Sequence, residues 1–286
     1  MKYKFLRFPE GKTKAVTFSY DDGNRTDLRL VEVLKRYDIK CTFNICSGKL
    51  GEVPGEGRLT PKEIKEHMLD SGHEIAVHGK VHKAPSLCRA VEGIEEILTC
   101  RRELEQTFGC IIRGMAYPDT GVARFHNQAS YEDIRRYLKA LDIAYARTIG
   151  GDNDSFRLPD DWYAWMPTAH HDNPHIMEYI QKFVDFDYTN VYRASREPKL
   201  FFMWGHSAEF SAKNNWEHLT EICDKISGRE DVWYATNMEI HEYVQAYHSL
   251  VQDADGTRIY NSTLHTIWLE ADGEVISIPS GQTVCL

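Results

Sequence analysis

Residues 15–46 read AVTFSYDDGNRTDLRLVEVLKRYDIKCTFNIC, and this stretch decides the fold class. Residues 15–20 form a short apolar run that predicts a buried strand, and residues 41–46 form a second one. Between them, Leu28, Val31 and Leu34 recur at helical spacing, so residues 27–37 are expected to form an amphipathic helix. A strand, a helix and a second strand in this order are typical of a parallel sheet with helices packed outside it.

The same alternation continues along the chain. Further strands are expected at residues 74–78, 114–117, 143–147, 200–204 and 232–235, and helices at residues 86–108 and 130–141. Thr60 and Thr236 each precede a glutamate by three residues, which is the capping-box pattern of a helix start. About seven strand–helix repeats predict an α/β fold, in which a closed sheet would carry its active site at the carboxyl ends of the strands.

The pattern changes after about residue 250. Residues 258–269 are rich in β-formers, and Ala271-Asp272-Gly273-Glu274 is a turn signal before the apolar residues 275–278. The sequence therefore predicts two parts, a (β/α) barrel over residues 1–250 and a C-terminal hairpin or small sheet over residues 251–286.

Composition excludes several classes of partner. The 286 residues include 34 Lys plus Arg and 43 Asp plus Glu, a net charge of −9, so no basic face for nucleic acid or an anionic membrane is expected. No stretch of about 18 apolar residues suggests membrane insertion. The seven cysteines form no CxxC pair, and the first residues lack a signal-peptide pattern. We expect a cytoplasmic protein with reduced thiols. The sequence leaves the oligomeric state open.

Polar, ionisable side chains follow three of the expected strands. Asp21 and Asp22 follow the first, His78 and His82 follow the strand at residues 74–78, and His206 follows the strand at residues 200–204. Two histidines and a carboxylate can hold a catalytic zinc ion and leave a position open for water. A second carboxylate beside that site could act as a general base, and a histidine on the opposite side as a general acid.

These residues resemble motifs of the polysaccharide deacetylases, the NodB-homology group also called carbohydrate esterase family 4. Residues 17–23, TFSYDDG, resemble the first motif with one extra residue, and residues 78–82, HGKVH, resemble the second. Residues 116–121, AYPDTG, resemble the third motif loosely, and His206 resembles the histidine of the fifth. The resemblance covers about residues 15–235 and implies a distorted (β/α) barrel of about seven parallel strands with a β-rich C-terminal extension.

The resemblance also implies roles for individual residues. Asp21 is the expected catalytic base and His206 the catalytic acid. Asp22, His78 and His82 are the expected ligands of one divalent metal ion, zinc by preference, with cobalt or another divalent ion as an alternative.

The chain departs from the family pattern in its third and fourth motifs. Gly79 stands where a Ser or Thr usually braces the site, and Ala116 stands where the third motif has an arginine. We predict that Arg147 takes over from that arginine, pairing with Asp21 and holding it ionised, and that a guanidinium fork grips both carboxylate oxygens. In a competing interpretation, Asp160-Asp161-Trp162 supplies the Asp-Trp pair of the fourth motif.

Substrate contacts are expected from the same rim of the sheet. Tyr117 and Asp119 are candidate substrate-binding residues, with the Asp119 backbone N–H as a donor to the oxyanion. Trp204 is a candidate platform for stacking against a sugar. Glu209, three residues after His206, is a candidate for orienting that histidine. His170 and His171 could touch the metal or the substrate, although exposed loop histidines are commoner.

The expected reaction is metal-dependent hydrolysis that removes an N-acyl or O-acyl group, such as acetyl, from a carbohydrate. An amidase of the same fold, acting on small amides such as cyclic imides or ureides, is an alternative. A sugar-binding module that has lost the reaction is a third hypothesis, and a structural barrel with coincidental motifs is a fourth.

Overall fold

The computed structural model of the chain describes residues 3–192 and 195–286. Its main sheet consists of parallel strands in the order β6-β5-β4-β3-β2-β8-β7, and β9 pairs with the start of β2. The strands are β2 (Lys14–Asp21), β3 (Cys41–Ile45), β4 (Glu74–Val77), β5 (Gly114–Ala116), β6 (Tyr145–Arg147), β7 (Ala169–His170), β8 (Lys199–Gly205) and β9 (Val232–Tyr234). A single bridge between Arg147 and Trp165 links β6 to the segment that leads into β7. The predicted distorted (β/α) barrel is confirmed.

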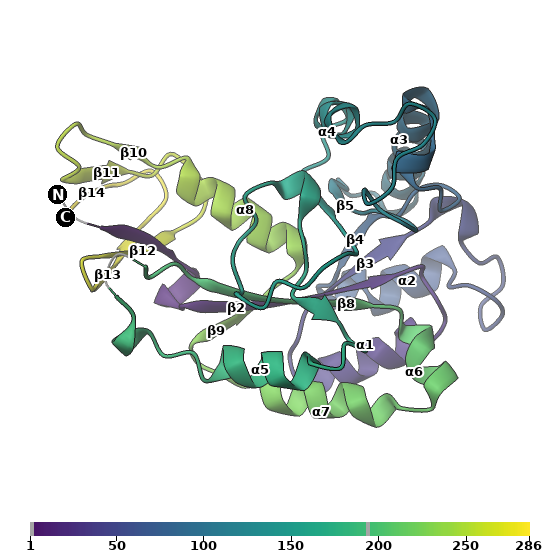
Figure 1. Cartoon of the computed structure of the whole chain (residues 1–286), viewed down its shortest axis with the longest axis horizontal. Coiled ribbons are helices and arrows are strands. Elements are labelled where there is room, and N and C mark those ends of the chain that lie inside the picture. The colour runs from purple at the N-terminus through teal and green to yellow at the C-terminus, as the bar shows by residue number, and fades with distance from the viewer. Residues whose placement is uncertain (1–2, 193–194) are drawn as a thin grey trace.

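Helices cover the outside of this sheet (Figure 1). They are α1 (Asp27–Arg36), α2 (Pro61–His67), α3 (Ala90–Phe108), α4 (Tyr131–Ala140), α5 (Ile176–Val184), α6 (Ser207–Lys213), α7 (Trp216–Ile226) and α8 (Asn237–His248). α5 and α7 lie side by side along one face, and α3 packs beside α4. The capping boxes predicted at Thr60 and Thr236 are both present. No helix among the described residues is both long and apolar enough to cross a bilayer.

β2 pairs with three other strands, and its eight residues are all buried. It pairs with β8 along one edge, and with β9 and then β3 along the other. Parallel strands with both faces covered are expected to be apolar throughout, because neither face meets water. Phe18 and Tyr20 are fully buried here, and the strand ends at the buried carboxylate of Asp21.

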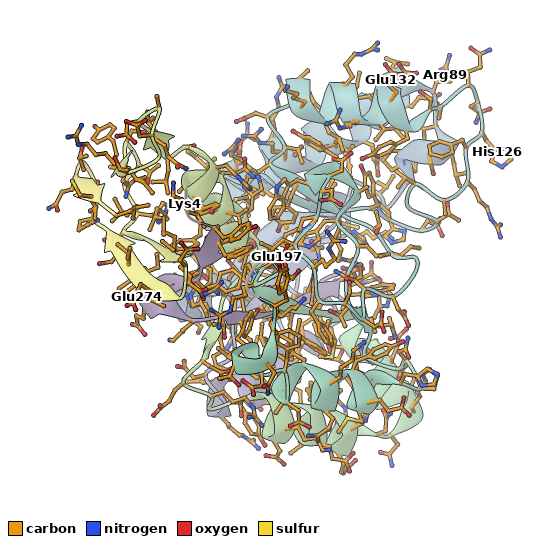
Figure 2. The ribbon with its side chains drawn as sticks, turned by 60° about the vertical axis from the view of Figure 1, so that its left-hand side comes forward. Lys4, Arg89, His126, Glu132, Glu197 and Glu274 are labelled. Atoms are coloured by element: carbon orange, nitrogen blue, oxygen red, sulfur yellow. The ribbon has the colours of Figure 1, made fainter. Side chains whose placement is uncertain are left out.

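The first strand and the last five strands form two small antiparallel sheets beside the barrel. β1 (Lys4–Arg7) pairs with β12 (Ile267–Ala271), which forms a hairpin with β13 (Glu274–Ile278). The second sheet joins β10 (Val251–Gln252), β11 (Arg258–Tyr260) and β14 (Thr283–Cys285). In Figure 2, Glu274 of β13 and His126 lie on opposite sides of the molecule. The predicted domain boundary at residues 250 and 251 stays a prediction.

The predicted start of the long helix at residue 86 was wrong. Cys88 and Arg89 are extended, with ψ angles of 156° and 154°, and α3 begins only at Ala90. Glu92 accepts a hydrogen bond from the Arg89 backbone N–H at 2.9 Å. This bond gives a partner to one of the amides at the helix start that have none within the helix.

Candidate metal centre and active site

The predicted site residues converge at one end of the sheet. Asp21 is the last residue of β2 and Arg147 the last of β6, while His78 directly follows β4 and His206 directly follows β8. Parallel strands place their carboxyl ends at the same rim, so residues far apart in the sequence meet there.

Asp22, His78 and His82 form a compact group of ligand atoms. Their ligand atoms all lie within 4.8 Å of one another, and Asp22 Oδ1 is 3.9 Å from His78 Nε2 and 3.6 Å from His82 Nε2. His78 Nδ1 lies 3.0 Å from the Ala116 carbonyl, to which it donates, so the Nε2 lone pair faces Asp22. Burial holds the pKa of His78 below its ordinary value, which favours the neutral ring that a metal requires.

This group fits a divalent cation. Asp22 Oδ1 and His78 Nε2 are both buried, and neither makes a hydrogen bond with any residue in the described parts of the chain. Buried polar atoms without partners are costly, and a cation would satisfy both of them. Two imidazole nitrogens and one carboxylate oxygen are the donor set of many catalytic zinc sites.

Asp21 forms a buried ion pair with Arg147. The Arg147 Nη2 atom lies 2.7 Å from Asp21 Oδ1 and 2.5 Å from Oδ2, and both side chains are almost fully buried. Asn44 Nδ2 donates a further hydrogen bond to Oδ1 at 2.8 Å. Burial by itself would raise the pKa of Asp21, but the charge of Arg147, with smaller contributions from His78 and His206, outweighs burial and lowers it.

The predicted contact between Arg147 and Asp21, with bonds to both carboxylate oxygens, is therefore present, but it is not a fork of two nitrogens. A single nitrogen, Nη2, spans both carboxylate oxygens, while Nη1 donates to the Thr148 carbonyl at 3.3 Å. The guanidinium also lies over the Trp204 ring, 4.5 Å from its centroid. A cation on an aromatic face is stabilised by the ring, so Trp204 helps to hold Arg147 in place.

His206 lies near the same carboxylate. Its Nε2 lies 3.9 Å from Asp21 Oδ2, its Nδ1 lies 3.4 Å from Glu209 Oε1, and its side chain is 30% exposed. Burial would lower the pKa of His206, but the bond to Glu209 and the charge of Asp21 outweigh burial and raise it. The arrangement can keep an ionised carboxylate and a protonated imidazole beside one metal centre.

Comparison with known families agrees with this geometry. A family model described as Polysaccharide deacetylase matches residues 9–149. Residues 9–149 belong to the polysaccharide deacetylase family. The matched segment includes Asp21, Asp22, His78, His82 and Arg147, whereas His206 lies beyond it. No curated protein matches the chain.

Two solved structures share the barrel of this polysaccharide deacetylase domain. A protein from Mycobacterium smegmatis described as a polysaccharide deacetylase superposes with a TM-score of 0.56 at 16% identity, over 87% of this chain and 96% of its own. The allantoinase PuuE superposes with a TM-score of 0.57 at 13% identity, over 84% of this chain and 93% of its own. At these identities the likeness shows the fold alone.

The other predicted residues lie in different surroundings. Tyr117 is fully buried, and its hydroxyl donates to the Tyr163 carbonyl at 2.8 Å, which argues against contact between its side chain and a substrate. Asp119 lies on an exposed turn after β5, with a φ angle of 56°. Trp204 remains half-buried, although Arg147 and His170 pack against its ring.

The competing assignment of the fourth motif finds no support in this geometry. Asp161 accepts hydrogen bonds from Tyr131 and from the Tyr163 backbone, and Arg135 pairs with it at 3.2 Å. Trp162 packs against Trp165. None of these partners is Asp21 or Arg147.

A second polar cluster, which we call the histidine cluster, was not predicted as a unit. It contains His170, His171, Asp172 and Glu209, whose ligand atoms also lie within 4.8 Å of one another. The expectation that His170 and His171 are exposed loop residues was wrong, because β7 ends at His170 and His171 is fully buried. β7 has only two residues, too few for a periodic pattern in the sequence.

Hydrogen bonding favours a polar network over a second metal site here. The Asp172 N–H donates to His170 Nδ1 at 3.1 Å, so the neutral ring carries its proton on Nε2, which faces Glu209 Oε2 at 3.1 Å. Lys213 neutralises Asp172 at 2.6 Å. Glu209 thus lies within 3.1 to 3.4 Å of a nitrogen of His170, His171 and His206, and these interactions outweigh burial and lower its pKa. Glu209 is thereby kept as an anion beside His206.

Proposed function

We propose that the protein removes an acetyl group from a carbohydrate by metal-dependent hydrolysis. The observation that carries the proposal is the group of Asp22, His78 and His82, which stands next to the buried pair of Asp21 and Arg147 and the half-buried His206. Membership of the polysaccharide deacetylase family supports the substrate class.

One divalent cation, zinc by preference and cobalt as an alternative, would be held by Asp22, His78 and His82. When bound, such a cation polarises the acyl carbonyl and makes a neighbouring water molecule more acidic. Every other role in the reaction falls to residues of this chain.

Asp21 acts as the general base. It removes the proton of the attacking water as the oxygen bonds to the acyl carbon. Arg147 and Asn44 keep its carboxylate ionised and oriented, since both donate hydrogen bonds to it. We propose the Asp119 backbone N–H as a donor to the carbonyl oxygen as negative charge develops on it.

His206 acts as the general acid. The carbon–nitrogen or carbon–oxygen bond breaks, and the proton on His206 Nε2 passes to the leaving atom. Glu209, beside Nδ1, stabilises the protonated ring before this transfer. Acetate and the deacetylated sugar are the products.

The test is acetate release from N-acetylglucosamine oligomers of graded length and from an O-acetylated glycan, with zinc added and with chelator. Release should require the metal and should fall by about 10²-fold or more in the Asp21→Asn variant. If the metal-loaded protein released no acetate from any of these substrates, the proposed reaction would be wrong.

An amidase that acts on a cyclic imide or ureide is the second candidate. It is supported by the likeness of the barrel to the allantoinase PuuE and by Ala116 in place of the usual arginine. A parallel assay that follows ring opening of small cyclic amides decides, because an amidase of this kind would hydrolyse them in preference to the acetylated sugars. We also propose that the protein acts in the cytoplasm. Its seven cysteines are all free, and thiols are kept reduced in that compartment.

A further inference from the structure

The loop that carries both histidine ligands has a strained backbone. It joins β4 to the segment before α3, and its φ angles are +76° at Gly79 and +69° at His82. Positive φ angles are unfavourable for a residue with a side chain, so His82 needs support from its neighbours to stay in this conformation.

Glu96 of α3 supplies that support. Its side chain is buried, and its Oε1 atom accepts the backbone N–H groups of Val81 at 2.7 Å and Lys83 at 3.1 Å. These two amides lie on either side of His82. The backbone carbonyl of Glu96 also accepts the Lys80 N–H at 3.1 Å, so one turn of α3 binds the loop at three positions.

Gly79 is adapted to the same carboxylate. A Cβ atom at this position would lie 2.9 Å from Glu96 Oε1, which is too close for an ordinary contact. Together with its positive φ angle, this approach explains why glycine stands here. The carboxylate of Glu96 occupies the space that a side chain at residue 79 would need.

We propose that Glu96 is a positioning residue for the metal ligand His82 and that it sets the affinity of the centre for its cation. Glu96 acts through the loop, since its carboxylate bonds to the amides that flank the ligand. The inference rests on the proposed metal site, and it names a residue outside the predicted ligands and catalytic groups.

The experiment compares the zinc affinity of the full chain in four forms by competition with a chromophoric chelator. Glu96→Ala removes both hydrogen bonds and should weaken zinc binding by about 10- to 100-fold, the usual effect of removing a residue that supports a ligand. Glu96→Gln keeps an oxygen that can accept both bonds and should lose less. The control, Glu95→Ala, changes an exposed glutamate on the same helix and should bind zinc as the unaltered chain does.

A second measurement needs no metal. In the metal-free protein, amide hydrogen exchange at Val81 and Lys83 should be faster in Glu96→Gln than in Glu95→Ala, because the charged acceptor is weakened. Glu96→Gln changes few atoms, so it still tests the role of Glu96 if Glu96→Ala does not fold.

Two failures can be told apart. If the unaltered chain binds zinc but folded Glu96→Ala binds it equally tightly, the positioning role of Glu96 is wrong and the proposed metal site stands. If the unaltered chain binds no zinc, the metal site itself is wrong, and the role of Glu96 falls with it.

Discussion

Replacing Arg147 by methionine should strongly destabilise the fold, because it leaves the Asp21 carboxylate buried without its cation. The side chains of Arg147 and Asp21 are 0% and 2% exposed, so water cannot replace the lost contact. Asn44 would still donate one hydrogen bond, but the nearest histidine nitrogens are 3.9 Å away. Removing one partner of a buried ion pair costs about 3–5 kcal/mol. We expect a loss of this size in Arg147→Met.

The assay is urea unfolding of the metal-free protein, prepared with a chelator. It compares the unaltered chain, Arg147→Met, Asp21→Asn and the double variant. The double variant has no unpaired charge, so it should recover most of the stability that Arg147→Met loses, since neutral replacement of a buried pair is often tolerated. Activity should stay absent in the double variant, because the general base is gone. If the two single effects simply add in the double variant, the two residues do not act as a pair and the reasoning is refuted.

Three further predictions follow from the same geometry. The His78→Ala/His82→Ala variant should lose nearly all bound metal in elemental analysis; retention of one metal ion per chain would contradict the ligand assignment. Glu209→Gln should lower the pKa of His206 and move the alkaline limb of the kcat/KM profile to lower pH, because the acid then loses its proton earlier; an unmoved limb would exclude this role. Burial lowers the pKa of His73 to about 4, so between pH 6.5 and 4 the unfolded chain binds more protons than the folded chain. The free energy of unfolding should therefore fall by up to about 3 kcal/mol as the pH drops through this range. Urea unfolding of His73→Asn should show a smaller dependence of stability on pH. An unchanged slope in that variant would show that other groups carry the acid sensitivity.

The sequence predicted the main part of the site because the fold has a simple rule. Parallel strands bring their carboxyl ends together, so the polar residues that follow apolar runs could be assigned to one rim from their order in the chain. Arg147 could be assigned in the same way, since it ends a predicted strand and a buried carboxylate needs a counter-charge.

The parts that the sequence did not predict depend on side-chain packing between distant segments. The single-nitrogen contact of Arg147 follows from its position over Trp204, which no spacing reveals. The histidine cluster joins β7 to Glu209 on α6, two elements that local patterns did not indicate. Glu96 binds its loop across 13 and 15 residues, so its role becomes visible only once α3 lies beside that loop.

The most direct test of the proposed mechanism is a zinc titration of the metal-free protein. The readout is acetate release from an N-acetylglucosamine oligomer. Release should rise with added zinc and level off at one equivalent per chain. The Asp21→Asn variant should bind the same single equivalent and release almost no acetate. Acetate release without metal, or release by Asp21→Asn at the rate of the unaltered chain, would contradict the assignment of Asp21 as the base beside a single metal centre.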